Sequence, residues 1–245
     1  MSLSAVIVVR DEEANVAACV RSVRWADEVL VVDTGSTDAT VQVCRDLGVR
    51  VEQVAWEGFG PTKQHAVELA AHDWVLSVDA DERVTDSLAE EVRTLLAGVP
   101  EHAAYRVKRR SHYLGREIRH AGWGRDWVLR LFDRTQGGFR PLQVHEYVRS
   151  NGTKGRLKGH LLHYPYPDVV THRVKMRRYA AIAARLRREQ GKRPGRAGAL
   201  IRAAARFVRM YLVQGGFLDG WEGLLLCTNS MYGVYLKYAM RDGGR

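Results

Sequence analysis

The chain has 245 residues, of which 46% are hydrophobic and 27% are charged, a composition typical of a globular protein with a substantial core. Its formal net charge of +10 indicates an anionic partner, such as a phosphorylated substrate, a negative membrane leaflet or a nucleic acid. Cys19, Cys44 and Cys227 have no CxxC or Cys/His spacing, which argues against a disulfide framework or a zinc site and favours a reducing cytosol.

The N-terminus carries neither a basic nor an apolar leader, so we expect no signal peptide. The least polar window runs from Gly223 to Leu236 and is shorter than the roughly 20 residues that a membrane-spanning helix needs. The composition therefore predicts a protein that contacts a membrane surface without crossing the bilayer.

The first hundred residues alternate between apolar runs and helical patterns. The apolar runs at 3–9, 28–32, 49–54 and 74–78 are typical of buried strands, and helical patterns end near Arg24 and Leu47 and extend over 61–71 and 86–96. Ser87 and Glu90 have the spacing of a capping box at the start of the last helix. Strands and helices in this order predict a parallel sheet with right-handed crossovers, half of a nucleotide-binding α/β fold.

Three of the predicted strands end in carboxylates: Asp11 to Glu13, Asp33, and Asp79 to Glu82. Since parallel strands point the same way, we expect these acids to converge on one edge of the sheet, just past the strands and facing water. An Asp-x-Asp pair at a strand end supplies hard oxygen ligands for Mg²⁺ or Mn²⁺ on a diphosphate. The alternative is a polar turn without a ligand.

Phosphate-binding glycine loops are missing from this half of the chain. Neither GxGxxG after the first strand nor GxxxxGK[ST] is present, which argues against NAD enzymes and P-loop NTPases. Diphosphate charge would then be offset by the metal and by basic side chains. Lys63, after Gly58-Phe59-Gly60, is a candidate for that role, with a solvated lysine at a helix start as the alternative.

From residue 103 to residue 163 the pattern changes to short alternating segments separated by glycine and polar residues, which predicts antiparallel strands added to the first sheet. Glu146 is our candidate general base on the acceptor side, with an ordinary glutamate on a surface strand as the alternative, and Asp126 is the reserve candidate. His160 or His163 is a candidate to complete the metal site with Asp81, and we assign His163.

After Pro167 the chain is predicted to be helical and strongly basic, with arginine and lysine interleaved with apolar residues from Arg173 to Arg209. Amphipathic basic helices of this kind bind anionic lipid, although a merely solvated basic face is an alternative. The following stretch, Phe217 to Met240, is rich in Trp, Tyr, Leu and Gly and nearly free of charge. We therefore predict a helical appendage, over 167–245, that contacts a membrane surface.

Three motifs in this order resemble the nucleotide-sugar half of family 2 glycosyltransferases, which have the GT-A fold. They are Val6-Ile7-Val8-Val9-Arg10-Asp11-Glu12-Glu13, Val31-Val32-Asp33-Thr34-Gly35-Ser36-Thr37-Asp38 and Ser77-Val78-Asp79-Ala80-Asp81-Glu82. The later Trp127-Val128-Leu129-Arg130-Leu131-Phe132, Val144-His145-Glu146 and Gly215-Gly216-Phe217-Leu218-Asp219-Gly220 resemble the bacterial lipopolysaccharide-core subgroup of WaaE type, β-1,4-glucosyltransferases acting on inner-core heptose.

The resemblance implies a role for several residues. Asp33 would hydrogen-bond the uracil of UDP, the backbone near Val9 and Arg10 would line the base pocket, and Asp79 would approach the ribose. Asp81 would bind the metal on the diphosphate, and Glu146 would deprotonate the acceptor hydroxyl in an inverting displacement. The implied fold is a mixed sheet flanked by helices. It places a glycosyltransferase domain over 1–166, with a nucleotide-sugar half over 1–100 and an acceptor half over 101–166.

Our principal hypothesis is an inverting, metal-dependent transferase that moves a hexose, glucose in the first instance, from a UDP-sugar to a phosphorylated glycolipid, the heptose inner core of lipopolysaccharide. We expect it to be cytoplasmic and peripheral on the inner face of the bacterial inner membrane, and the sequence leaves a homo-oligomer open. One alternative keeps the donor site and uses a polyprenyl phosphate acceptor. Another is a basic nucleic-acid-binding protein, against which stands the lack of any recognition motif, so we expect no nucleic acid.

Overall fold

The computed structural model describes residues 1–140, 147–191 and 195–240, and it divides into two compact units. Unit 1 comprises residues 1–109 and 127–163, and unit 2 comprises residues 110–126 together with 164–245. The sequence placed 110–126 with the acceptor half, whereas the structure groups this segment with the C-terminal helices. No helix in the described ranges is long and apolar enough to cross a membrane.

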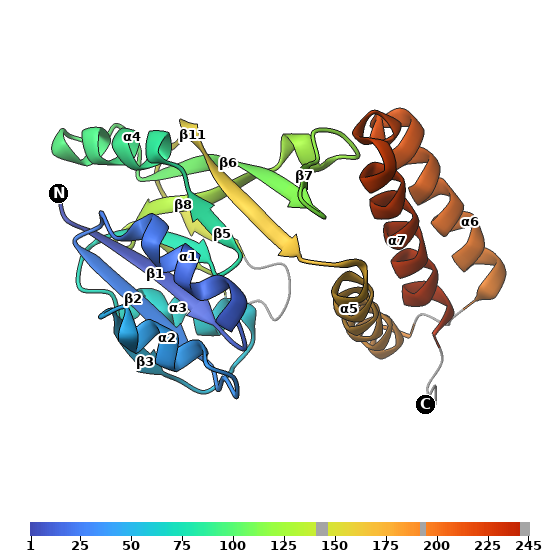
Figure 1. Ribbon diagram of the computed structural model, residues 1–245, viewed down its shortest axis with the longest axis horizontal. Coiled ribbons are helices and arrows are strands. Elements are labelled where there is room, and N and C mark those ends of the chain that lie inside the picture. The colour runs from blue at the N-terminus through green and yellow to red at the C-terminus, as the bar shows by residue number, and fades with distance from the viewer. Residues whose placement is uncertain (141–146, 192–194, 241–245) are drawn as a thin grey trace. The chain divides into compact units, whose positions relative to one another are not determined.

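The parallel half of unit 1 follows the predicted alternation. Strands β1 (Leu3–Val9), β2 (Glu28–Asp33), β3 (Arg50–Gln53) and β4 (Trp74–Asp79) pair in the order β3-β2-β1-β4, all parallel (Figure 1). The helices between them are α1 (Glu13–Val23), α2 (Thr40–Asp46) and α3 (Phe59–Glu68). This arrangement confirms the predicted α/β half.

The sheet continues beyond β4 with strands from later in the chain, in the order β8 (Trp127–Asp133), β6 (Ala104–Tyr113), β11 (Lys154–Tyr166) and β5 (Glu82–Val84). Strand β8 is antiparallel both to β4 and to β6, and β11 is antiparallel to β5. Strands β9 (Gly137–Phe139) and β10 (Val148–Ser150) form a separate antiparallel pair. The predicted addition of antiparallel strands to a parallel sheet is therefore confirmed.

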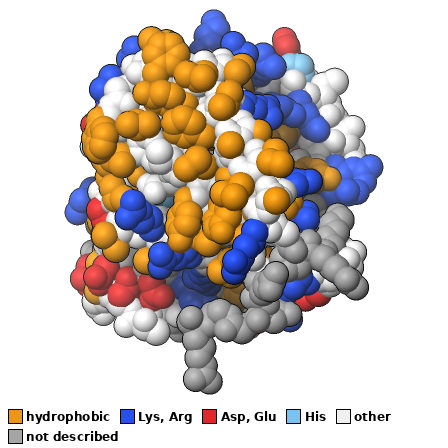
Figure 2. All heavy atoms as spheres, turned by 90° about the vertical axis from the view of Figure 1, so that its right-hand side faces the viewer, with side chains coloured by type: hydrophobic (Ala, Val, Ile, Leu, Met, Phe, Trp, Pro, Cys, Tyr) orange, Lys and Arg blue, Asp and Glu red, His pale blue; other side chains and the backbone are white. Residues whose placement is uncertain are grey.

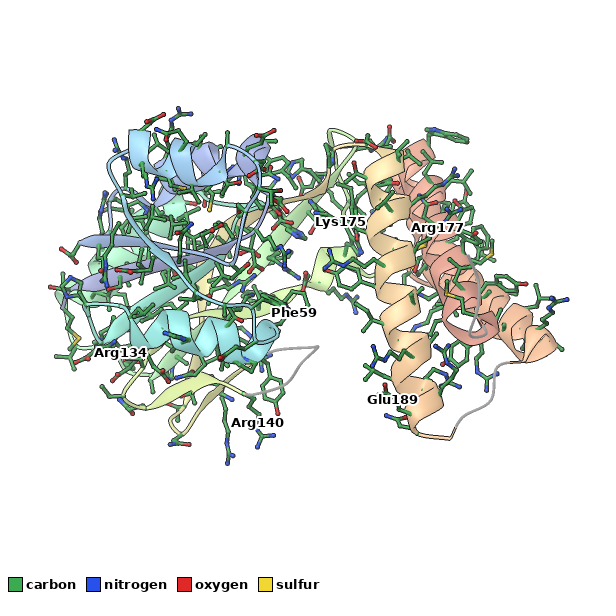
Figure 3. All side chains as sticks on the ribbon, turned by 90° about the horizontal axis from the view of Figure 1, so that it is seen from below. Phe59, Arg134, Arg140, Lys175, Arg177 and Glu189 are labelled. Atoms are coloured by element: carbon green, nitrogen blue, oxygen red, sulfur yellow. The ribbon has the colours of Figure 1, made fainter. Side chains whose placement is uncertain are left out.

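Both faces of the central strands are covered, which explains their continuous apolar sequences. Alternate residues of β1 enter two cores: Ala5 and Ile7 pack with residues of α1 and α4 (Asp86–Ala97), and Val6 packs with residues of α3. The guanidinium of Arg134 lies near the C-terminal end of α3 and donates to the carbonyl of Ala70 at 2.7 Å (Figure 3). The helix cap predicted at Ser87 is wrong, because Thr85 Oγ1 accepts the N–H of Leu88 at 3.3 Å.

Unit 2 contains three long helices, α5 (Val169–Glu189), α6 (Arg196–Val208) and α7 (Gly220–Ala239), with α7 packed against both of the others. The π-helical η2 (Arg209–Val213) and η3 (Gly216–Asp219) connect α6 to α7. The earlier stretch of unit 2 contains β7 (Arg116–Glu117), which pairs with the end of β6, and η1 (Trp123–Arg125). Its core is formed by Tyr113, Ile118, Ala121, Met210, Leu226 and Cys227. As the sequence predicts, the described part of 167–245 is mainly helical.

Candidate functional site

The ends of β1, β2 and β4 meet at one edge of the sheet. Val9 pairs with Asp33 across β1 and β2, and Val8 pairs with Asp79 across β1 and β4. Three segments that are far apart in the sequence are thus brought into register at their carboxyl ends, where open α/β sheets bind ligands. The prediction that the carboxyl ends of these strands meet at one edge of the sheet is confirmed.

Asp33 holds the loop that follows β2. Its carboxylate is fully buried and accepts the N–H of Gly35 and the N–H of Ser36, both at 3.1 Å. Gly35 has φ +94°, a backbone conformation that favours glycine. The carbonyl of Val9 accepts the N–H of Thr34 at 3.0 Å, and the side chain of Arg10 is exposed. These contacts shape the edge, and the nucleotide-binding roles of Val9, Arg10 and Asp33 stay predictions.

The carboxylates after β1 bind the loop after β2 rather than standing free. Asp11 accepts the N–H of Thr37 at 2.7 Å, and Glu13 accepts the N–H of Ala39 at 3.0 Å. In return, Thr40 Oγ1 accepts the N–H of Glu12 at 2.8 Å. These acids therefore serve to join two loops at the candidate site.

A buried cluster of charges lies where β4 ends. Asp79 accepts from Lys63 Nζ at 2.7 Å and from the guanidinium of Arg130, and Glu82 accepts from Arg130 at 2.6 Å and from Arg109 at 3.2 Å. Burial raises the pKa of Asp79, but the positive charges of Arg130 and Lys63 outweigh it and hold that pKa well below its usual value. Burial likewise opposes the charge of Arg130, and its two carboxylate partners raise its pKa above the ordinary value. Asp79 and Arg130 are therefore both charged near neutral pH.

Two expectations change at this cluster. Glu82 does not face water as the sequence suggested: it is fully buried on β5, because two arginines neutralise its charge. Lys63, proposed as a phosphate ligand, lies on α3 with a side chain only 9% exposed and is paired with Asp79. Whether Lys63 also reaches a diphosphate stays a prediction.

Asp81 and His163 lie close together, as the metal-site hypothesis requires. Asp81 Oδ2 and His163 Nε2 are 3.7 Å apart, longer than the roughly 3.0 Å between neighbouring ligands of an octahedral ion at about 2.1 Å, so the two side chains would move slightly toward each other to bind one ion. Burial lowers the pKa of His163 and the nearby Asp81 opposes that shift, with the net direction downward, so the ring is available as a neutral ligand. The described residues contain no group of three or more His, Cys, Asp and Glu side chains that could hold a metal. Among the described residues, Asp81 and His163 would thus contribute two ligands, and a diphosphate would contribute others.

The two candidates for the general base are not placed at this edge by the structure. Glu146 lies outside the described residues, which stop at residue 140 and resume at residue 147. Asp126 is described but belongs to unit 2, directly after η1. Both assignments stay predictions from the sequence.

A pocket of about 500 Å³ opens beside Asp79 within unit 1. Four basic side chains line it, together with aromatic and aliphatic ones: Arg106, Arg109, Arg130 and Lys154, then Trp127, Val128, Leu129, Phe139, Tyr147 and Val148. Asp79 is the acid among these lining residues, and its charge is already balanced by Lys63 and Arg130. Within the described chain, Arg130 Nε is buried without a hydrogen-bond acceptor. The pocket is suited to an anionic ligand.

The sequence analysis missed most of this pocket and the role of Arg130. One signal was present: Arg130 interrupts the apolar strand Trp127-Val128-Leu129-Arg130-Leu131-Phe132, and a charge in a buried strand requires a partner. Arg106 and Arg109 lie in a run of basic residues on β6, which sequence alone does not distinguish from a solvated surface.

Comparison with known proteins gives consistent matches. The profile described as Glycosyl transferase family 2 matches residues 4–158. The chain is 31% identical to the lipopolysaccharide core biosynthesis glycosyltransferase LpsC of Rhizobium meliloti (strain 1021), over 98% of this chain and 94% of that protein. It is 27% identical to the uncharacterized glycosyltransferase RT0209 of Rickettsia typhi, over 97% of this chain and 85% of that protein.

Among solved structures, residues 1–349 of TarS from S. aureus superpose on the chain with a TM-score of 0.50. The sequence identity is 16%, and the match covers 72% of this chain and 64% of the TarS chain. A similarity at this level shows that the two proteins share a fold, and it gives no information about the ligands of this chain.

Proposed function

Because the chain belongs to glycosyl transferase family 2 and has the GT-A fold, we propose that it transfers a hexose from a UDP-sugar to the heptose inner core of lipopolysaccharide, with inversion at the anomeric carbon. The observation that carries the proposal is the placement of Asp81 beside His163 at the end of β4. The alignment with LpsC along nearly the whole chain supports lipopolysaccharide core as the acceptor class. Glucose is the sugar that the subgroup resemblance favours.

On the donor side, the loop held by Asp33 and the edge beyond Val9 would receive the nucleotide, and Asp81 with His163 would hold Mn²⁺ or Mg²⁺. A bound divalent ion neutralises charge on the departing diphosphate. Arg130 and Lys63 keep Asp79 ionised and fix its carboxylate at the end of β4. A carboxylate fixed in this way accepts hydrogen bonds from ribose hydroxyls without first reorganising.

On the acceptor side, the pocket beside Asp79 supports a substrate that carries negative charge. Arg106, Arg109 and Lys154 line it, and charge-assisted hydrogen bonds from such groups recognise phosphate and carboxylate oxygens. Trp127 and Tyr147 also line the pocket and add aromatic surface for sugar rings. Glu146 would accept the proton of the attacking hydroxyl as the new glycosidic bond forms and UDP leaves. A polyprenyl phosphate acceptor would use the same positive charges.

The donor half of the proposal is tested by thermal unfolding with UDP, with Mn²⁺ and with both. We expect the pair to raise Tm most, since a ligand at 100 times its Kd stabilises a protein by about 2.7 kcal/mol. Asp81→Asn should lose the metal-dependent part of that rise. Asp46→Asn, which changes an exposed carboxylate on α2, should respond like the wild type. An unchanged response in Asp81→Asn would remove Asp81 from the site.

The acceptor half is tested by UDP release from a panel of UDP-sugars, with lipopolysaccharide core oligosaccharide or polyprenyl phosphate as acceptor. We expect release with the core oligosaccharide and a UDP-hexose. Release with polyprenyl phosphate alone would select the alternative acceptor. The absence of release with every donor, in a protein that still binds UDP and Mn²⁺, would contradict the acceptor classes proposed.

A further inference from the structure

Unit 2 exposes an unusual concentration of large apolar side chains between residues 200 and 221. Seven of them are at least half exposed, and we call them the helical apolar surface: Leu200 60%, Ile201 71%, Leu212 57%, Val213 78%, Phe217 50%, Leu218 56% and Trp221 65%. Single exposed apolar residues are ordinary, but a group of this size on adjoining elements marks an interaction site. These residues lie on α6, η2, η3 and the first turn of α7.

Helix α6 has two apolar sides, and only one of them is used by the fold. Ala199 and Ala203 are buried on the side that packs within unit 2. Leu200, Ala204 and Val208 recur at intervals of four residues on another side, and all three are exposed. The exposed apolar side therefore faces away from the core of unit 2 and has no partner among the described residues of that unit.

Positive charge borders the helical apolar surface. The segment from Arg196 to Leu218 contains four arginines, Arg196, Arg202, Arg206 and Arg209, and no Asp or Glu. At a helical spacing of about 100° per residue, Arg202, Arg206 and Arg209 fall between the buried side and the exposed apolar side. Figure 2 shows apolar side chains gathered on the face that carries α6 and α7, with lysine and arginine beside them.

We propose that the helical apolar surface docks on an anionic lipid bilayer, with α6 lying in the interface and Arg196 and Arg209 contacting lipid phosphates, while Arg202 and Arg206 contact Tyr238 and Ser230 of α7. An amphipathic helix with a basic border lies in the membrane plane with its apolar side among the acyl chains, and each nearby arginine adds attraction to an anionic leaflet. This inference concerns a surface of unit 2 and does not depend on the transferase activity proposed for unit 1.

The same charges disfavour a second copy of this chain as the occupant. In a twofold interface the same patch meets itself, so the arginines of one copy would face the arginines of the other. Arg196 to Leu218 contains no acid, and of the two acids near Trp221, Asp219 is buried and Glu222 is paired with Arg116, so neither is offered to a second copy. An anionic bilayer satisfies both the apolar side chains and their basic border.

The experiment is sedimentation of the full chain with vesicles of phosphatidylcholine alone and with added phosphatidylglycerol. We expect binding to the anionic vesicles that weakens as salt is raised. Val213→Glu should weaken that binding about tenfold or more, because it places a charge where an apolar side chain enters the interface. The matched control is Val99→Glu on unit 1, where the valine is also highly exposed, 87% against 78% for Val213.

A second pair of variants separates charge from apolar contact. Arg196→Gln with Arg209→Gln should reduce anionic vesicle binding, whereas Arg21→Gln with Arg45→Gln, the same charge change on exposed positions of α1 and α2, should not. Equal binding by Val213→Glu and Val99→Glu, or no preference for anionic vesicles, would overturn the proposal. So would light scattering that shows a dimer in solution that Val213→Glu dissociates.

Discussion

At the scale of single residues, Arg130 is central to the buried charge of unit 1. Its side chain is 7% exposed and bonds both Asp79 and Glu82. Glu82 is fully buried, and Arg109 alone would remain to balance it if Arg130 were lost. Arg130 therefore links the buried ion pair with Glu82 to the carboxylate of Asp79 at the end of β4.

We expect Arg130→Met to lower the free energy of unfolding by about 3–5 kcal/mol, because it leaves a buried carboxylate without its main partner. Urea unfolding followed by circular dichroism measures this loss. Arg93→Met is the matched control, since Arg93 is 53% exposed and its 3.6 Å pair with Glu90 is worth less than about 1 kcal/mol. A similarly small decrease in the free energy of unfolding for Arg130→Met and Arg93→Met would contradict the prediction that the Arg130 ion pairs stabilise the fold. Glu82→Gln should recover part of the loss in the Arg130→Met background.

The sequence predicted some residues of this site and not others, for a physical reason. Asp79 and Asp81 were found because a strand that ends in acids is a local pattern. The pairing of Glu82 with Arg130 joins residues 48 positions apart, on strands whose order in the sheet is not local information. Without that order, the cost of burying Glu82 suggested that it faces water. The same limit hid the basic pocket, because Arg106 and Lys154 are on strands far apart in the sequence.

At the scale of elements, close contact between β11 and α4 fixes how the helix covers the sheet. A Cβ added at Gly159 of β11 would lie 2.4 Å from Cα of Leu88 on α4. The backbone of the helix thus approaches the strand at a position where no side chain fits. The sequence predicted the helix over 86–96 and antiparallel strands between 103 and 163, but it carried no sign that this glycine is required.

We expect Gly159→Ala to destabilise the protein by about 1–3 kcal/mol, because the new methyl group forces α4 away from the sheet. Gly98→Ala is the control: it sits at the end of the same helix with φ −96°, and its nearest neighbour is the carbonyl oxygen of Leu95 at 3.8 Å. Both substitutions lower the conformational entropy of the unfolded chain by a similar amount. The difference between their Tm values therefore measures the effect of the close contact between Gly159 and Leu88. Equal Tm values for Gly159→Ala and Gly98→Ala would contradict the prediction, because they would show that α4 moves away from the sheet without loss of stability.

At the scale of the whole molecule, the two units bury polar groups in different ways. Unit 1 buries the ion pairs around Arg130, whereas unit 2 buries, besides the carboxylate of Asp219, a neutral group in which the hydroxyl of Tyr113 lies 2.9 Å from Nδ1 of His172 and Asn229 Nδ2 lies 3.2 Å from the same atom. Burial, and to a lesser degree the charge of Arg173, lowers the pKa of His172 to about 4. The units should therefore respond differently to acid.

We expect stability to fall as pH decreases from about 6.5 toward 5. In that window the unfolded chain, whose histidine pKa is near 6.5, binds a proton at this position that folded His172 does not, which costs about 2 kcal/mol at pH 5. Asp79 has a pKa well below its usual value, so its stabilising charge remains until the solution is more acidic. Urea unfolding at pH 7.5 and pH 5 should show a smaller difference in His172→Gln. An unchanged difference, or protonation of His172 above pH 5 by NMR, would contradict this account.

Unit 2 is built from two stretches of chain that are separated by part of unit 1. Ile118 from the first stretch packs with Met210 and Leu226 from the second, and the carboxylate of Asp219 accepts the N–H groups of Arg119 and His120 at 3.1 and 2.8 Å. The C-terminal helices are therefore an integral part of unit 2, and they cannot be deleted without exposing its core. A chain truncated after His163 would expose the apolar side chains of residues 110–126 that pack against the C-terminal helices, such as Ile118. An evolutionary or engineered exchange of these helices must therefore include residues 110–126.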